Sequence, residues 1–218
     1  MSEPLTYTFS DIDLENKKFF SHIFPELSMS NKSYYKPYIS YKGLKVYASF
    51  RVDFECECRL QIKLVKARQD IPQGIDVGIH NARLKFPYEN RETKNSFIFI
   101  YDYSYGPAET KTPIELYCTP IKFRNKEKQQ QKKWLMIYNI WEMKRSDGRI
   151  ERCSWGGDHG VVIEQKKQNE YRLYFSCGEV DHQNITFQDL VIDVAIEGEY
   201  TPRFQCGEIF PLNSIVRL

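Results

Sequence analysis

The sequence lacks the features of several large classes of protein. No stretch approaches the roughly 18 consecutive apolar residues that a membrane helix needs, so no membrane insertion is expected. The first residues, Met1-Ser2-Glu3-Pro4, do not form a basic region followed by an apolar one, so no secretory signal is expected there. These two absences predict a soluble, cytoplasmic protein.

Alanine is scarce, whereas tyrosine and phenylalanine are abundant, with 15 and 14 copies among 218 residues. A chain rich in aromatic residues and poor in alanine favours sheets over helices. This length suffices for one large β domain, and neither an internal repeat nor a clear interdomain linker is present. We therefore expect residues 1–218 to form a single domain.

Short catalytic motifs are missing as well. The chain has no Gly-x-Ser-x-Gly nucleophile elbow and no Walker phosphate loop, so no enzyme class and no cofactor are indicated, although an enzyme stays open. The six cysteines are expected to be small buried apolar residues of a protein in a reducing compartment. They are Cys56, Cys58, Cys118, Cys153, Cys177 and Cys206.

The strongest positive signal is an alternation of apolar and polar residues over residues 44–64. Every even position is apolar, and the ten odd positions are polar apart from Tyr47, with seven of them charged. A period of two residues is typical of a β-strand with one buried and one solvated face. Charged residues of the solvated face are expected to form ion pairs across strands. They include Arg51, Asp53, Glu55, Glu57 and Arg59.

This alternation is too long for one ordinary strand. Residues 44–64 would span about 70 Å at about 3.3 Å per residue, and no Gly, Pro or Asn interrupts them. Either a continuous strand that bends or a hairpin with an odd-length loop near Cys56 preserves the alternation. We predict a bent strand that serves both sheets of a sandwich, with Cys56 and Cys58 in the core.

Further short strands, separated by turn signals, predict an all-β protein. The expected fold is an antiparallel two-sheet sandwich of jelly-roll type, because no segment with helical periodicity lies between these strands. Asp147-Gly148 is the strongest hairpin signal. The strand at 97–101 and the one at 134–143 are apolar on nearly both faces and are expected centrally in a sheet. The expected strands are 82–86, 96–103, 114–118, 134–143, 149–154, 161–165, 170–177 and 189–197.

One short helix is predicted near the N-terminus. Ser10 is a suitable N-cap, and apolar residues recur at roughly helical spacing until Pro25. We expect a helix at 11–23, followed by an irregular lead-in, with residues 1–42 packed on the sandwich.

A basic run between two expected strands is the first candidate site. Residues 122–133 hold six cations and one carboxylate, which gives +5, whereas the whole chain carries +2 and its remainder therefore −3. Such a loop can contact phosphates without reading sequence, and the alternative is a solvated loop that maintains solubility. The cations are Lys122, Arg124, Lys126, Lys128, Lys132 and Lys133.

A second candidate lies in two glycine-containing loops, at 153–160 and 177–182. Cys153, His159, Cys177 and His182 have the chemistry of zinc ligands, although their spacing matches no compact zinc motif. Metal analysis of the purified protein would test this alternative, since stoichiometric zinc that is lost on His159→Ala would favour it. The other interpretation is a glycine-rich hairpin loop.

Two functions follow from these features. The first is a non-enzymatic structural or binding protein that acts through its surface, by self-association or with a protein partner, and contacts nucleic acid weakly through the basic loop. Its architecture is similar to that of viral coat and movement proteins at the level of fold alone. The alternative is a metal-dependent enzyme or ligand-binding β-barrel that uses the loops at 153–160 and 177–182.

Overall fold

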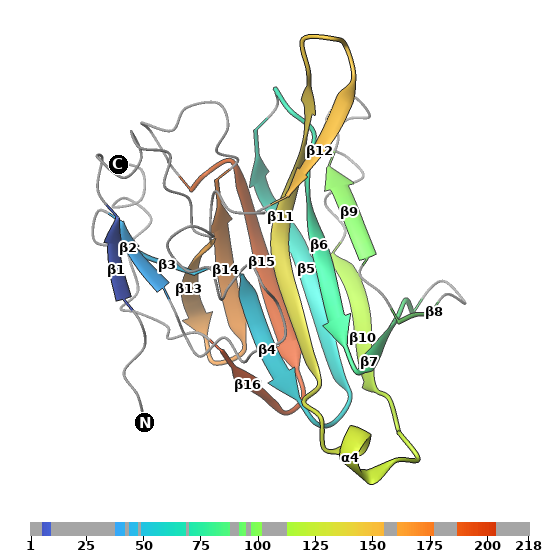
Figure 1. Cartoon of the computed structure of the whole chain (residues 1–218). Coiled ribbons are helices and arrows are strands. Elements are labelled where there is room, and N and C mark those ends of the chain that lie inside the picture. The colour runs from blue at the N-terminus through green and yellow to red at the C-terminus, as the bar shows by residue number, and fades with distance from the viewer. Residues whose placement is uncertain are drawn as a thin grey trace.

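The protein is built almost entirely of β-strands, as a computed structural model shows (Figure 1). The structure describes residues 6–9, 38–41, 44–47, 49–68, 70–87, 92–94, 97–101, 113–154, 161–176 and 187–203. In these ranges the one helix is α4 (Lys126–Gln129), and no helix there is long and apolar enough to span a membrane. The helix predicted at 11–23 lies outside the described residues.

In the part of the chain that the structure describes, the strands form two sheets, and the first has ten strands. Its neighbouring strands are antiparallel, except that β1 and β2 are parallel. In spatial order the strands are β1 (Thr6–Phe9), β2 (Tyr38–Tyr41), β3 (Leu44–Tyr47), β13 (Val161–Lys167), β14 (Glu170–Phe175), β15 (Leu190–Glu197), β5 (Cys58–Ala67), β10 (Ile114–Pro120), β7 (Ala82–Lys85) and β8 (Glu92–Thr93).

The second sheet has six strands among the described residues, all paired antiparallel. In spatial order they are β16 (Tyr200–Pro202), β4 (Phe50–Phe54), β11 (Trp134–Lys144), β6 (Gln73–His80) and β9 (Phe97–Tyr101), and β12 (Ile150–Ser154) pairs with β11. The prediction of an all-β, antiparallel two-sheet sandwich is therefore confirmed.

The chain passes repeatedly from one sheet to the other. The successive strands β3, β4, β5, β6 and β7 lie in alternate sheets, and β9, β10 and β11 alternate in the same way. Connections between the sheets distinguish jelly-roll arrangements from a simple meander. As a result, β5 lies between β15 and β10, so the centre of the large sheet joins segments that are distant in the sequence.

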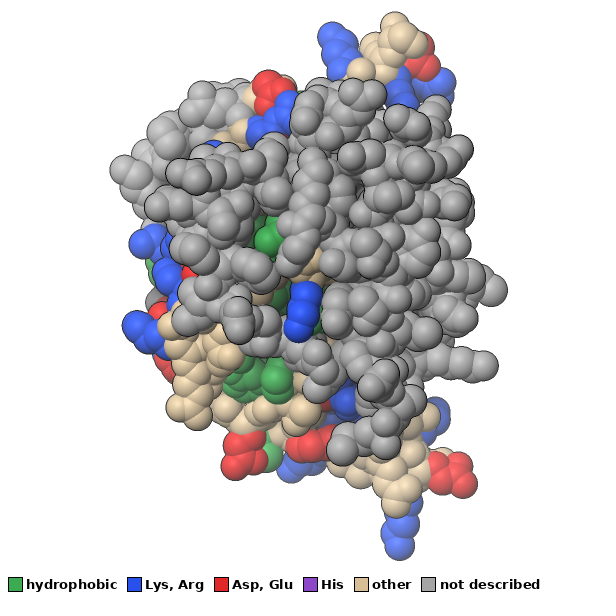
Figure 2. All heavy atoms as spheres, turned by 90° about the vertical axis from the view of Figure 1, so that its left-hand side faces the viewer, with side chains coloured by type: hydrophobic (Ala, Val, Ile, Leu, Met, Phe, Trp, Pro, Cys, Tyr) green, Lys and Arg blue, Asp and Glu red, His purple; other side chains and the backbone are tan. Residues whose placement is uncertain are grey.

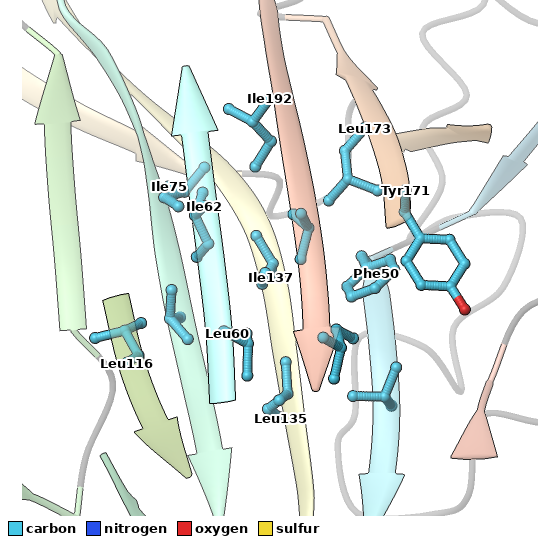
Figure 3. Packing of buried hydrophobic residues seen from close by; sticks show 14 of the residues in the cluster. Phe50, Leu60, Ile62, Ile75, Leu116, Leu135, Ile137, Tyr171, Leu173 and Ile192 are labelled. Carbon is cyan, nitrogen blue, oxygen red and sulfur yellow. The ribbon is translucent and has the colours of Figure 1, made fainter. Parts of the chain in front are cut away.

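The hydrophobic core fills the space between the sheets (Figure 3). Ile137 of the six-stranded sheet and Leu60 of the ten-stranded sheet are fully buried there. Phe50 and Tyr171 connect the two sheets directly, with ring centroids 5.3 Å apart. Each fully buried side chain of this size contributes about 1.5–3 kcal/mol, so the core accounts for most of the stabilisation.

The alternation at 44–64 serves both sheets, but as three strands rather than one bent strand. β3 and β5 belong to the ten-stranded sheet, whereas β4 between them belongs to the six-stranded sheet. The three residues 55–57 connect β4 to β5, and an odd number of residues keeps Phe54 and Cys58 on the inward side. Cys56 lies in this connection and is exposed, so the prediction that it is buried is wrong, while Cys58 is buried.

The charged face of this segment is consequently divided between the outer surfaces of the two sheets. Arg59 bonds to Glu115 at 2.8 Å and to Glu197 at 3.2 Å, so it connects β5 to both of its neighbours. On the other sheet, Asp53 of β4 binds Arg203. The predicted cross-strand ion pairing is confirmed.

Most strand predictions outside this segment are also confirmed, with three corrections. Residues 38–41, expected in the irregular lead-in, form β2, which pairs with β3. β6 was not among the expected strands; it lies between β11 and β9 and ends at His80. β11 is central, as predicted, whereas β9 stands at the end of its sheet among the described strands. The hairpin at Asp147-Gly148 is confirmed, since Gly148 has φ +83° and joins β11 to β12.

Candidate functional site

The basic loop connects β10 to β11 and projects from the lower end of the sandwich in Figure 1. Its centre is the single turn of α4. Asn125 caps this turn, because its Oδ1 accepts hydrogen bonds from the backbone N–H of Glu127, at 2.8 Å, and of Lys128, at 3.4 Å. Asparagine is among the best N-cap residues, so the local sequence explains why a helical turn begins here.

Asn81, in the turn between β6 and β7, holds both ends of the loop together. Its backbone carbonyl accepts from the N–H of Ile121 at 2.9 Å, and its Nδ2 donates to the carbonyl of Lys132 at 3.2 Å. The same Nδ2 donates to Gln131 Oε1 at 3.3 Å. Asn81 has φ +54°, a conformation that asparagine tolerates better than most residues. The loop is therefore closed at its base by a neighbouring turn.

Lys133 differs from the other cations of the run. Its side chain is buried, and its Nζ lies 2.6 Å from Glu55 Oε2 and 3.2 Å from the carbonyl of Gln129. Its own carbonyl accepts from the N–H of Phe54 at 3.1 Å. This corrects the sequence interpretation, because Lys133 ties the loop to the connection between β4 and β5 and is not presented to a partner.

The remaining five cations of the loop are exposed. They are Lys122, Arg124, Lys126, Lys128 and Lys132. Glu127 is the single carboxylate among them, so the exposed part of the loop carries +4. None of the described ion pairs involves Lys122, Arg124, Lys126 or Lys128. Figure 2 shows lysine and arginine side chains at this lower end of the molecule.

A second group of residues lies directly beside the loop, on the outer face of the six-stranded sheet. Trp134, the first residue of β11, stacks on His80 of β6 with ring centroids 5.1 Å apart and an interplanar angle of 14°. The guanidinium carbon of Arg51, on β4, lies 4.5 Å from the centroid of the Trp134 ring. We call these three side chains the Trp134 stack.

Charge and burial act together on the Trp134 stack. Partial burial and, secondarily, the nearby charge of Arg51 lower the pKa of His80 below its ordinary value of 6.5. Both effects favour the neutral form of the imidazole. A guanidinium over an indole ring is attracted by the negative face of the π system, which stabilises the position of Arg51.

The proposed zinc ligands are not placed by the structure. His159, Cys177 and His182 lie outside the described residues, and for Cys153 only the backbone, on β12, is described. Within the described ranges, no three or more His, Cys, Asp or Glu side chains are arranged to hold a metal ion. The metal alternative stays a prediction.

Cys58 and Cys118 face each other on β5 and β10 and are both buried. Their mutual hydrogen bond, together with burial, raises the pKa of the Cys118 thiol well above its ordinary value. A buried protonated thiol is a poor nucleophile, so these two cysteines act as core residues.

The sequence interpretation did not find the Trp134 stack. The available signal was the position of Trp134 directly after the basic run. His80 and Arg51 come from separate strands, and only the pairing of β4, β11 and β6 brings them to that ring.

Comparison with known proteins gives no match: no family model, no curated protein and no solved structure matches the chain. The fold and the site together define an all-β sandwich with a closed, exposed, positively charged loop. Its function is therefore argued from the site itself.

Proposed function

We propose that the protein is a non-enzymatic binding protein that contacts the phosphate backbone of a nucleic acid through its basic loop. The contacts would be made by Lys122, Arg124, Lys126, Lys128 and Lys132. Such contacts are electrostatic and carry no sequence information.

The observation that supports this proposal is that a loop with a net charge of +4 on its exposed part is held in a defined shape. Asn81 closes its base, Asn125 caps its helical turn, and Lys133 binds it to Glu55. A surface that is ordered before binding loses less conformational entropy when a ligand arrives. The exposed cations are thus presented together at a small entropic cost.

The composition of the loop favours a phosphate polymer over an apolar partner. Phe123 is the one aromatic residue between Lys122 and Lys133, and it is partly buried. Its backbone N–H donates to Gln129 Oε1 at 2.7 Å, which holds it within the loop. The outward surface is therefore polar and cationic, a combination that suits a chain of phosphates.

Binding to a fluorescently labelled oligonucleotide, followed by anisotropy over a series of salt concentrations, tests this function. The triple variant Lys122→Gln, Lys126→Gln, Lys128→Gln should bind at least about tenfold more weakly. The slope of the logarithm of its affinity against the logarithm of the salt concentration should become smaller in magnitude by about one per cation removed.

A matched control uses the hairpin at the opposite end of the molecule. The triple variant Lys144→Gln, Arg145→Gln, Arg149→Gln removes the same charge, so both triple variants change from +2 to −1. It should bind like the unmodified protein. Equal weakening by both variants would show that net charge alone matters, and no binding at low salt would refute the function.

Self-association stays a prediction beside this proposal. Light scattering of the purified protein over a range of concentrations tests it, because an oligomer would raise the measured mass independently of any nucleic acid.

A further inference from the structure

The Trp134 stack and the basic loop share a continuous piece of backbone. Lys132 and Lys133 end the loop and lead directly into Trp134, while His80 is followed at once by Asn81, the residue that closes the loop. The loop and the Trp134 stack are therefore adjacent along the chain at both Lys133–Trp134 and His80–Asn81.

The direction of these side chains follows from the register of the sheet. Leu135 and Ile137 of β11 are buried in the core. Successive side chains of a strand point to opposite faces, so Trp134, directly before Leu135, points to the outer face of the sheet. Trp134 is directly opposite His80 on β6 and Asp53 on β4, and residues directly opposite each other share a face. The ring thus lies on the outer face of β11, which pairs with β4 on one side and β6 on the other.

The stack offers a flat surface with little negative charge. His80 is exposed, and it is held parallel to the indole of Trp134 within 14°. The carboxylate of Asp53 binds Arg203, whose Nε lies 2.8 Å from Oδ2, so that negative charge is neutralised. Burial and the charge of Arg51 lower the pKa of His80, which favours the uncharged ring, and an uncharged ring places no second positive charge near Arg51.

We propose that the basic loop and the Trp134 stack form one surface for single-stranded nucleic acid, with phosphates on the loop and an unpaired base on His80. This inference rests on the proposed function. Bases of a duplex are paired and stacked inside it, whereas bases of a single strand are free to stack on protein side chains. A cationic track combined with an aromatic platform is typical of proteins that bind single strands.

The test compares a labelled single strand of 15 thymidines with a labelled 15-base-pair duplex of dA and dT. The unmodified protein should bind the single strand at least about tenfold more tightly. His80→Ala should weaken single-strand binding about fivefold or more and leave duplex binding and the salt dependence unchanged, since stacking contributes without an ionic contact.

His80→Phe is the decisive companion variant, because it keeps a flat ring in the same place. It should retain single-strand binding. Tryptophan fluorescence adds a measurement that needs no change at His80: the single strand should quench it, and the duplex should not. This quenching should disappear in Trp134→Phe.

Equal affinity for both probes, or equal effects of His80→Ala on both, would overturn the single-strand inference and leave the loop function intact. A His80→Phe variant that binds as weakly as His80→Ala would also overturn it. By contrast, a loop triple variant that binds both probes like the unmodified protein would overturn the proposed function itself.

Discussion

The two ends of the sandwich carry charged projections that behave differently. At one end, the exposed part of the basic loop holds five cations and one carboxylate. At the other end, the β11–β12 hairpin holds three cations and three carboxylates between residues 142 and 151. Figure 2 shows charged side chains on both projections.

In the hairpin, charged side chains form ion pairs with one another. Arg145 binds Glu151, and Arg149 Nη2 lies 2.6 Å from Asp147 Oδ2. In the loop, the buried Lys133 pairs with Glu55, whereas none of the described ion pairs involves the four exposed cations Lys122, Arg124, Lys126 and Lys128. The number of charged residues is therefore a poor guide to a binding surface, and their pairing distinguishes the two ends.

The largest expected difference between the two ends is in the stability lost when a glycine with positive φ is replaced by alanine. A Cβ added to Gly198, at the loop end, would lie 2.9 Å from the carbonyl oxygen of Glu57, whereas one added to Gly148 of the hairpin meets nothing within 4 Å. Both substitutions strain the backbone. We expect Gly198→Ala to lower the free energy of unfolding by about 3 kcal/mol and Gly148→Ala by about 1 kcal/mol. Urea denaturation measures both, and equal losses would contradict the close packing around Gly198.

The ion pair of Lys133 should contribute more than that of Arg145. Lys133→Met removes a buried amine with two hydrogen-bond partners and frees the base of the loop. We expect it to lower the free energy of unfolding by about 2 kcal/mol. Arg145→Gln, in an exposed pair, should leave thermal unfolding unchanged, because such pairs contribute little in water. A stable Lys133→Met variant would show that the loop is held by other contacts.

Substitutions of Asn81 test whether oligonucleotide binding depends on the closed shape of the loop as well as on its charge. Asn81→Ala loses the side-chain bonds to Gln131 and Lys132 and also strains a residue at φ +54°, so we expect a loss of about 1–2 kcal/mol. Asn81→Gly loses the bonds alone and should be less destabilised. Both variants should bind the oligonucleotide more weakly although every cation remains. Unchanged binding in both would mean that charge acts without the defined loop shape.

The smallest expected effect is on the acid titration of the hairpin. A hydrogen bond from Arg145 lowers the pKa of Glu151 below its ordinary 4.5, and one from Arg149 lowers the pKa of Asp147 below 3.8. Because both folded-state values are lowered, the stabilisation is present above the ordinary values and is lost as the pH falls through the lowered ones.

NMR titration of the side-chain carboxyl carbons measures these midpoints. In Arg145→Gln, the midpoint of Glu151 should rise toward 4.5, while that of Asp147 should move much less. An unchanged midpoint for Glu151 would show that the hairpin pair is not formed in solution.

Local patterns were sufficient to predict most of the strands. β10, β11, β12, β13, β14 and β15 lie where alternation and turn signals place them. β6 was missed because Gly74, Asp76 and Gly78 occupy its outer positions and are poor strand formers, although Ile75 and Val77 alternate inward and are buried. The position of β9 at the end of its sheet depends on which strands pair, which no local pattern reports.

The candidate site was predictable in part for the same reason. A run of lysines between two strands is visible in the sequence, and five of its six cations are exposed. The burial of Lys133 was not predictable, because Glu55 comes from the connection between two other strands. The Trp134 stack likewise requires three strands to pair in one register.

The sequence by itself determined the class of fold, the inward side of the strands that alternate clearly and the sign of the loop. These properties depend on near neighbours, since a period of two residues orients side chains in the same way in either sheet. Only the tertiary structure decided that residues 44–64 divide into three strands of two sheets, and which charges are paired. Those outcomes depend on contacts between residues far apart in the chain, which local composition does not reveal.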